Sequence, residues 1–456
     1  MPEPTPPTPI ADALVLCMTR GMSLAEWERL GMLEREWSLY EHIGEGYRQI
    51  VVLSYGDAEQ EGRVAGLLSP APIVVTPADA ADAPANVAEA LGDARTVVVK
   101  TNQMDGVEAA IRTAHHLRGT GRRVGLIARG GYLRSRFAAD QFGPASREAN
   151  DAAAEERAIC EAADVIVGST PDMAHALAWR YGVAFERTRV IPNFVMAMGP
   201  STCACDRKPV VLYAGQLVKR KRVDMLLRAF ARLSDENKQR LTLSIIGEGP
   251  EEDALKAQAA ELGVNAVFER RIGHVALQDR MRQAAIYSQA SALEGHPKAV
   301  IEAMACGAAV VVTDSPGMGE VITHGVTGLR VEPHEGALGD AIDLLVNDEE
   351  WREQMGHAAA HAAQDRFGLH VIGPLEEAAH RAAIESGGEG VGGPAGVRWD
   401  PALVEAGHGA AEAWALALGA FAKRLDASQT ERMLMRLEQT ARDMREQVTG
   451  AKRASA

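Results

Sequence analysis

A chain of 456 residues is about three times the commonest domain size, which excludes a single small module and predicts two domains with an extension. With 46% hydrophobic and 24% charged residues, the composition is that of a globular protein, which argues against wholesale disorder. The formal net charge of −14 argues against nonspecific binding of nucleic acid or anionic lipid over the whole surface, although local basic clusters can still bind phosphate.

The first half of the chain alternates short apolar, β-branched runs with helical stretches. This alternation predicts βαβ units and a parallel sheet. The first run leads into Arg20 and Gly21, after which Ser23 and Glu26 fit a capping box at the start of an amphipathic helix. Gly21 would let the backbone approach a phosphate closely, so it is a candidate binding residue. The predicted strands of this half are 13–18, 49–54, 73–76, 96–100, 124–128 and 164–168.

A cluster of arginines follows the strand predicted at 124–128. Arg129, Arg134 and Arg136 alternate there with glycine and aromatic residues up to Phe137. Guanidinium groups bind carboxylates and phosphates bidentately, so the cluster fits an anionic ligand or a sugar. An exposed turn is the alternative interpretation.

A stretch without clear periodicity, 200–209, is interpreted as an interdomain linker, and a second parallel sheet is predicted after it. Two doubly wound domains that face each other place ligands at the carboxyl ends of their strands, so the cleft between them is the expected site. The predicted domains are 1–198 and 199–385, followed by a glycine-rich linker and a helical extension at 386–456 with a packing or oligomerisation role. The strands of the second sheet are predicted at 210–214, 242–246, 267–268, 286–288, 308–313 and 329–331.

The five cysteines are an odd number scattered through a large chain, which is unlike a disulfide framework and fits a reducing cytosol. Cys203 and Cys205 form a C-x-C pair without a second pair nearby, which favours two thiols in a linker over a structural zinc. The N-terminus has no basic n-region and no apolar run approaches a bilayer span, so a cytoplasmic protein is expected. Histidines without metal-ligand spacing are interpreted as surface or core-edge residues: His115, His116, His175 and His274.

The strongest signal is a segment in which two glutamates, Glu294 and Glu302, flank the start of a helix. Pro297 suits the first position of a helix because its missing N–H would be unsatisfied there anyway, and Gly307 suits a helix end. The helix is therefore predicted at 297–305. The run of small and apolar residues after Glu302 describes a buried helix and strand, so Glu302 is expected at the edge of a core.

The start of this helix is a candidate anion site, because the free N–H groups of a helix N-terminus and its dipole favour negative charge. Glu294, on the loop before the helix, could accept hydrogen bonds from sugar hydroxyls, and Glu302 could accept two from the vicinal hydroxyls of a ribose. The two glutamates would thus bracket one nucleotide sugar. The alternative is that both are solvated surface residues. The amides expected to receive a diphosphate are those of Lys298, Ala299 and Val300.

The segment resembles the E-x7-E motif of glycosyltransferase family 4, the glycogen-synthase-like retaining GT-B enzymes. Residues 315–320 (SPGMGE), 324–329 (HGVTGL) and Pro333 match the continuation of that pattern, and the resemblance covers 205–370 well and the first domain loosely. It implies an α/β GT-B fold, with two doubly wound Rossmann-like domains facing across a cleft and, here, a helical C-terminal extension. It also implies that the first glutamate binds the donor hexose and the second the ribose, with Gly295 and His296 in the same donor site.

The family also carries a G-R-L-x-x-x-K motif whose arginine and lysine neutralise the departing diphosphate. This chain reads GQLVKRK at 215–221, so Lys221 matches and Gln216 stands where the arginine is expected. Either Arg220 or Arg222 compensates for the missing charge, or Gln216 hydrogen-bonds the phosphate neutrally. A solvated basic patch is the alternative for this run. The turn at 247–250 resembles the family's G-x-G-P turn, which makes Gly247 and Gly249 donor-binding candidates.

The resemblance implies a retaining enzyme, and with the features above it predicts a metal-independent hexosyltransferase that uses a nucleotide diphosphate sugar and no further cofactor. Its acceptor is a sugar, a lipid-linked molecule or a small molecule, and nucleic acid is not expected as a partner. Glu294, Lys221 and Arg129 are the catalytic candidates; many relatives have a histidine in place of Arg129. Two alternatives stay open: a nucleotide-sugar 2-epimerase and a noncatalytic nucleotide-sugar-binding protein. Peripheral contact with the inner face of a membrane and homo-oligomerisation through the C-terminal helices also stay open.

Overall fold

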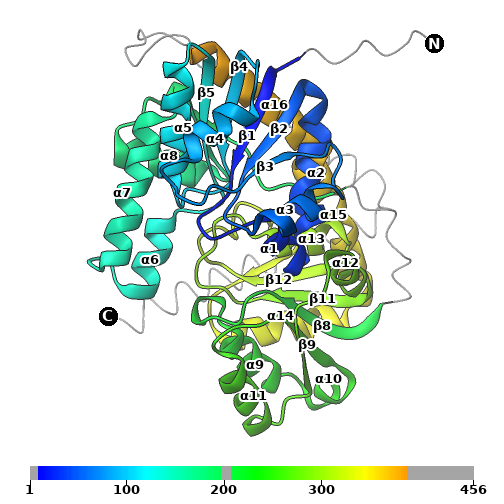
Figure 1. Cartoon of the computed structure of the whole chain (residues 1–456). Coiled ribbons are helices and arrows are strands. Elements are labelled where there is room, and N and C mark those ends of the chain that lie inside the picture. Colours follow the sequence, from blue (N-terminus) through cyan, green and yellow to red (C-terminus); the bar gives the residue numbers. More distant parts are fainter. Residues whose placement is uncertain (1–8, 197–206, 388–456) are drawn as a thin grey trace, which may run out of the picture. The chain divides into compact units, whose positions relative to one another are not determined.

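Two parallel β-sheets organise the part of the chain that the computed structural model describes, residues 9–196 and 207–387 (Figure 1). The first sheet has seven strands in the order β3-β2-β1-β4-β5-β6-β7. These strands are β1 (Ala11–Cys17), β2 (Tyr47–Leu53), β3 (Ile73–Val75), β4 (Thr96–Thr101), β5 (Arg123–Gly130), β6 (Val165–Gly168) and β7 (Thr188–Val190). The second has six strands in the order β10-β9-β8-β11-β12-β13. These strands are β8 (Lys208–Ala214), β9 (Thr242–Ile246), β10 (Ala266–Glu269), β11 (Ala284–Gln289), β12 (Ala309–Thr313) and β13 (Leu329–Val331).

The predicted α/β fold with two doubly wound sheets is confirmed. Each predicted strand overlaps an observed one, and only the three-residue edge strand β7 was not foreseen within the described residues. The central strands are apolar and covered on both faces, as parallel strands between helix layers must be. In β12, for example, all five residues, Ala-Val-Val-Val-Thr, are buried.

Helices cover both faces of the first sheet. One hydrophobic core lies under α4, α5, α7 and α8, and the core on the opposite face lies under α1, α2, α3 and α16. The helices of the first half are α1 (Leu24–Arg29), α2 (Leu33–Ile43), α3 (Ala58–Ala65), α4 (Ala83–Ala90), α5 (Val107–Gly119), α6 (Arg134–Phe142), α7 (Arg147–Ala162) and α8 (Pro171–Tyr181). Only one of the two hydrogen bonds of the capping box predicted for α1 is present. Ser23 Oγ accepts from the Glu26 amide at 3.0 Å, but the Glu26 carboxylate pairs with Arg29.

The second sheet is likewise sandwiched. Helices α9, α11 and α14 cover one face, and α12, α13 and the end of α15 cover the other. The helices of this half are α9 (Val223–Ala231), α10 (Asp235–Arg240), α11 (Glu252–Glu261), α12 (His274–Gln283), α13 (Lys298–Ala305), α14 (Glu335–Asn347), α15 (Glu349–Phe367) and α16 (Leu369–Ser386). None of the helices within residues 9–196 and 207–387 combines the length and the apolar character needed to cross a bilayer.

The last described helix, α16, leaves the second sheet and packs on the first. Its buried residues Ile372, Ala379 and Ala383 belong to the core that α2 shares with β1 and β2. The predicted domain 199–385 thus contains a helix that completes the other domain. Most of the predicted linker at 200–209, with Cys203 and Cys205, and nearly all of the predicted extension at 386–456 lie outside the described residues.

A buried cluster of charges fastens α16 to the first sheet. Glu376 of α16 lies 2.8 Å from Lys100 Nζ of β4 and 3.1 Å from Arg129 Nε of β5, and both Glu376 and Lys100 are almost completely buried. Burial opposes the charge of Glu376, but Lys100 and Arg129 outweigh it and hold its pKa well below the usual value. His380, one turn further along α16, is hydrogen-bonded to Tyr47 Oη at 2.5 Å.

Candidate active site

The strand order of the second sheet changes direction between β8 and β11, where open α/β sheets form a ligand crevice. The loops that follow these two strands therefore start side by side at the carboxyl ends of the strands and then lead to opposite halves of the sheet. The loop after β8 contains the 3₁₀ helix η4 (Lys219–Lys221), and the loop after β11 contains Glu294. They are joined by a backbone hydrogen bond from the Ala292 amide to the Arg220 carbonyl at 2.9 Å.

Three donors converge on one carboxylate oxygen of Glu294. Lys221 Nζ lies 2.6 Å from Oε1, Gln289 Nε2 lies 2.9 Å from it, and Arg220 Nη1 lies 3.3 Å from it. The side chain of Glu294 is only 9% exposed, so these contacts are shielded from water. Glu294 and Lys221, two of the catalytic candidates, are therefore in direct contact, and Arg220 lies beside them.

Two glycines explain how the loop after β8 is held in place. A Cβ atom on Gly247, whose φ is 152°, would lie 1.9 Å from the Gly215 carbonyl oxygen, and one on Gly249 would lie 2.3 Å from the Leu217 carbonyl oxygen. Neither position tolerates a side chain without moving the backbone. The G-x-G turn therefore packs against the loop that carries Lys221 and holds that loop in position. Gly247 and Gly249 were predicted to bind the donor, whereas their contacts here are with this loop.

The start of α13 is close to the predicted one. Pro297 stands at the N-cap with φ −76° and ψ 91°, and the helix runs from Lys298 to Ala305. The Val300 amide donates to the Pro297 carbonyl at 3.0 Å, so it is not free for a ligand as the sequence suggested. Only the amides of Lys298 and Ala299 remain for an anion at this end of α13.

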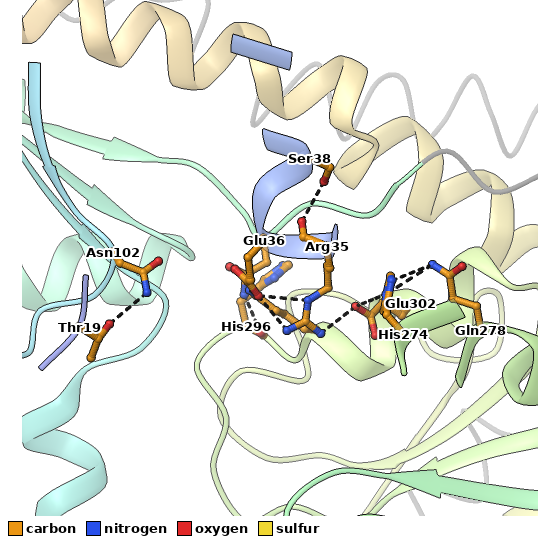
Figure 2. A network of polar contacts seen from close by, with 11 residues as sticks. Thr19, Arg35, Glu36, Ser38, Asn102, His274, Gln278, His296 and Glu302 are labelled. Atoms are coloured by element: carbon orange, nitrogen blue, oxygen red, sulfur yellow. Dashed lines mark hydrogen bonds and ion pairs between the residues drawn. The ribbon is translucent and has the colours of Figure 1, made fainter. Parts of the chain in front are cut away.

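Glu302 lies on the buried face of α13 and is 4% exposed, which agrees with its expected place at the edge of a core. Its Oε1 is 3.2 Å from Arg35 Nη1 and 3.3 Å from His274 Nε2. Arg35 comes from α2, which packs on the first sheet, and His274 begins α12 (Figure 2). Glu36, the next residue of α2, accepts from Lys298 Nζ at 2.6 Å.

These buried carboxylates are held in their charged form. Burial raises the pKa of Glu302, but Arg35 and then His274 outweigh it, so that the pKa is below its usual value. Burial likewise opposes the charge on Glu36, whose pKa is nevertheless lowered to about 2 by Lys298 and Arg35. Glu302 is therefore an anion at neutral pH, and both of its carboxylate oxygens can act as hydrogen-bond acceptors.

Three other predicted residues stand apart from these contacts. Arg129 is buried against Glu376 and donates to the Ile191 carbonyl at 3.1 Å, so its charge is committed to the cluster under α16. The Gln216 side chain is exposed. Gly21 is exposed with φ 74°, in the left-handed region that favours glycine, and has open space where a Cβ would be.

A small pocket connects Glu294 with the predicted arginine cluster. Gly295 packs against the first sheet's loops so closely that a Cβ there would lie 2.3 Å from the Gly131 carbonyl oxygen. Arg136 pairs with Asp172 at 2.7 Å, and Phe137 lies 4.5 Å from the Arg220 guanidinium, which stacks on its ring. The pocket is lined by Tyr132, Leu133, Arg136, Phe137, Thr170, Asp172, Met173, Glu294, Gly295, Gly317 and Glu320.

Sequence reasoning missed three residues of this region: Arg35, Glu36 and the role of His274. Arg35 and Glu36 lie in an ordinary amphipathic helix with no motif around them. The signal that was available for His274 is its position directly after Gly273 at a helix start, next to the crevice, and the absence of metal-ligand spacing drew attention away from it.

The buried ring of His296 is expected to make the stability of the protein sensitive to acid. Its ring is buried, packs edge-on against Phe367 at 5.0 Å, and has a pKa lowered to about 3, chiefly by burial and then by the positive charges of Arg366, Arg129 and Lys298. Below pH 6.5, His296 binds a proton in the unfolded chain but stays neutral in the folded chain. The free energy of unfolding therefore falls as the pH drops from 6.5 towards 3. We expect this residue to account for about 2 kcal/mol of lost stability at pH 5.

Urea unfolding of wild type and His296→Gln between pH 7 and pH 4.5 measures the effect. The variant should lose less stability on acidification than wild type. His361→Gln, which removes an exposed histidine of α15, is the control and should follow wild type. Parallel curves for all three proteins would contradict the assignment to His296.

Comparison with known proteins finds a family model that matches the part of the chain with this site. Residues 204–362 match the model of the glycosyl transferases group 1. The chain is 31% identical over 252 residues to a D-inositol 3-phosphate glycosyltransferase of Kribbella flavida, covering 51% of this chain and 59% of the relative. It is 30% identical over 257 residues to one of Nocardia farcinica, covering 51% and 55%. The matches thus span little more than half of the length of these curated relatives.

Solved structures share the fold. HepE of Anabaena, crystallised in complex with UDP and glucose, has a TM-score of 0.62 at 18% identity, over 80% of this chain and 98% of that one. Sucrose-phosphate synthase of Thermosynechococcus elongatus has a TM-score of 0.61 at 18% identity, over 82% and 100%. The part of the chain that carries Lys221, Glu294 and Glu302 is thus similar to the group 1 glycosyl transferases, and the two sheets have the GT-B fold of these solved structures.

Proposed function

We propose that this protein is a retaining glycosyltransferase that moves a hexose from a nucleotide diphosphate sugar to a small hydroxylated acceptor. The observation that carries the proposal is the Glu294 carboxylate, which lies 2.6 Å from Lys221 at the switch point of the second sheet, one loop before the anion-binding start of α13. A buried carboxylate held by a lysine beside a helix N-terminus suits a sugar whose leaving group is a diphosphate. Retention of configuration is inferred from the resemblance to a retaining family.

In this proposal the diphosphate rests against the amides of Lys298 and Ala299, with Lys221 and Lys298 as cations. Glu294 holds hydroxyls of the hexose, and Glu302 holds the ribose. The solved neighbour HepE is described in complex with UDP-glucose, which supports a nucleotide sugar as the donor. Two lysines and a helix start supply positive charge without a metal ion, so we propose metal independence, which transfer in the presence of excess EDTA would test.

Arg220 is the proposed substitute for the arginine that Gln216 replaces. Its Nη1 donates to the Leu293 carbonyl at 2.8 Å and also approaches Glu294, and its guanidinium stacks on Phe137. Arg222, the other candidate, pairs with Asp224 at 3.3 Å instead. Arg220 therefore brings the missing charge to the site from four residues further along the chain.

The acceptor is proposed to bind at the surface next to the small pocket between Glu294 and the arginine cluster. The residues that line this pocket include Tyr132, Thr170, Arg136 and Glu320, whose side chains can form hydrogen bonds with a compact polyol. The curated relatives are named for an inositol 3-phosphate acceptor, so that compound is the first to test.

The buried cysteines Cys17, Cys160 and Cys306 are free thiols, which supports the proposed cytoplasmic setting.

The test is turnover with a panel of UDP-, GDP- and ADP-hexoses, with and without inositol 3-phosphate and simple sugars. A glycosylated product whose anomeric configuration matches that of the donor supports the proposal. Isomerisation of the sugar at C2 that needs no acceptor would instead support a 2-epimerase. Tight donor binding without any turnover across the panel would support a noncatalytic binding protein.

Removing the charge of Lys221 is expected to weaken both donor binding and catalysis. Lys221→Gln should lower kcat/KM by about a hundredfold, because one preorganised donor to the leaving group is lost. Lys219→Gln is the matched control, since Lys219 is an exposed lysine two residues earlier in the same 3₁₀ helix. Equal activity of the two variants would show that Lys221 does not act on the leaving group.

A further inference from the structure

Four charged side chains, two from α13 and two from α2, form a row of alternating sign. Glu302 contacts Arg35 at 3.2 Å, Arg35 contacts Glu36 at 2.8 Å, and Glu36 contacts Lys298 at 2.6 Å. The most exposed of the four, Lys298, has a side chain that is 27% exposed. Figure 2 shows Arg35 between Glu36 on one side and the group formed by Glu302 and His274 on the other.

The two ends of this row are the groups to which the donor is assigned above. Glu302 is the ribose acceptor, but its Oε1 already receives Arg35 and His274. Lys298 is a phosphate partner, but its ammonium group already holds the Glu36 carboxylate. A guanidinium thus takes the place of ribose hydroxyls, and a carboxylate takes the place of a phosphate. Both substitutes are consecutive residues of one helix that belongs to the other sheet.

We propose that Arg35 and Glu36 act as an internal ligand that occupies the donor site and must be displaced by the nucleotide. The proposal rests on the function proposed above, since it assigns Glu302 and Lys298 to the donor. It adds that α2 competes with the donor, so that nucleotide affinity is lower than the site alone would give.

Displacement leaves no buried charge without a partner, which makes the exchange feasible. Arg35 donates to Glu36 through both Nε and Nη2, at 3.1 and 2.8 Å, so the pair neutralises itself when the nucleotide takes Glu302 and Lys298. An unpaired buried charge would otherwise be costly. The rest of α2 is anchored: Trp37 and Tyr40 are buried in the core of the first sheet.

The backbone near the start of α2 also reaches the second sheet's loops. A Cβ on Gly31, whose φ is 63°, would lie 3.1 Å from the Gly273 Cα, just before His274. The segment before α2 therefore contacts the same loop that presents His274 to Glu302.

The experiment is calorimetric titration of UDP, GDP and ADP into wild type and into Arg35→Gln/Glu36→Gln. The double variant keeps side chains of similar size but removes both charges of the internal ligand. We expect it to bind the preferred nucleotide about tenfold more tightly than wild type. Glu26→Gln/Arg29→Gln, an exposed arginine–glutamate pair on the neighbouring helix α1, is the matched control and should bind like wild type. If the double variant fails to fold, Glu36→Gln alone, which frees Lys298, should still tighten binding about threefold.

A mutant cycle with Glu302→Gln separates this inference from the proposed function. Arg35→Gln should tighten binding when Glu302 is present and should have no effect when Glu302 is glutamine. If wild type binds a nucleotide and Glu302→Gln weakens binding, but the Arg35 and Glu36 variants bind no better than wild type, the internal ligand is disproved and the donor site stands. If no variant binds any of the three nucleotides, the proposed donor site fails as well.

Discussion

Replacing Glu294 by glutamine is expected to lower kcat/KM for sugar transfer by two to three orders of magnitude, or about 3–4 kcal/mol of transition-state stabilisation. The carboxylate is the meeting point of Lys221, Gln289 and Arg220, and it is almost completely shielded from water. The amide of glutamine keeps the size of the side chain but loses the charge that holds these donors and the sugar hydroxyls. Because the lost interaction grows with the charge developed at the sugar, kcat should fall more than donor affinity.

Steady-state kinetics with the preferred donor and calorimetric donor binding separate these two effects. Glu332→Gln, an exposed glutamate just after β13, is the control and should retain wild-type rates. Thermal unfolding of both variants verifies that they are folded. A kcat/KM of Glu294→Gln within about tenfold of the wild-type value would show that Glu294 is not a catalytic residue.

Replacing Glu376 by glutamine is expected to destabilise the protein by about 3–5 kcal/mol, the largest effect on stability that we predict. Glu376 is the buried counter-charge of both Lys100 and Arg129, so the variant leaves two buried cations with a neutral partner. Burial lowers the pKa of Lys100 below its usual value even with Glu376 beside it. Without the carboxylate, Lys100 must give up its proton or take on water, and either costs free energy.

Urea unfolding at pH 7 measures this difference. Asp151→Asn breaks the exposed pair between Arg147 and Asp151 on α7 and should change stability by less than about 0.5 kcal/mol. Replacing all three charged residues by apolar ones, as in Lys100→Met/Arg129→Met/Glu376→Leu, should recover part of the loss, because no charge of the cluster is then buried alone. A loss below about 1 kcal/mol for Glu376→Gln would show that water reaches the cluster.

The elements of the fold follow from local patterns. Runs such as the Ala-Val-Val-Val-Thr of β12 are apolar and β-branched over the length of a strand, so they identify buried parallel strands wherever they occur. The segment from Glu294 to Gly307 could be interpreted for the same reason. Its proline and glycine delimit a helix by backbone constraints alone; Glu302 is placed by the geometry of that helix, and Glu294 by the loop before it. The positions of Glu294 beside Lys221 and of Glu302 in a core edge agree with that interpretation.

The partners of these residues could not be foreseen in the same way. Arg35 meets Glu302 across 267 positions of sequence, and α16 returns to the first sheet to place Glu376 against Lys100 across 276. Such pairs are set by how the two sheets and their helices pack, and nothing in the local sequence around an arginine in an amphipathic helix distinguishes a solvated charge from a buried one. Arg129 illustrates the point: its neighbours suggested a ligand contact, whereas the packing of α16 gives it a buried carboxylate. Local chemistry specifies strands, helix ends and loops, and long-range packing determines which charges become neighbours.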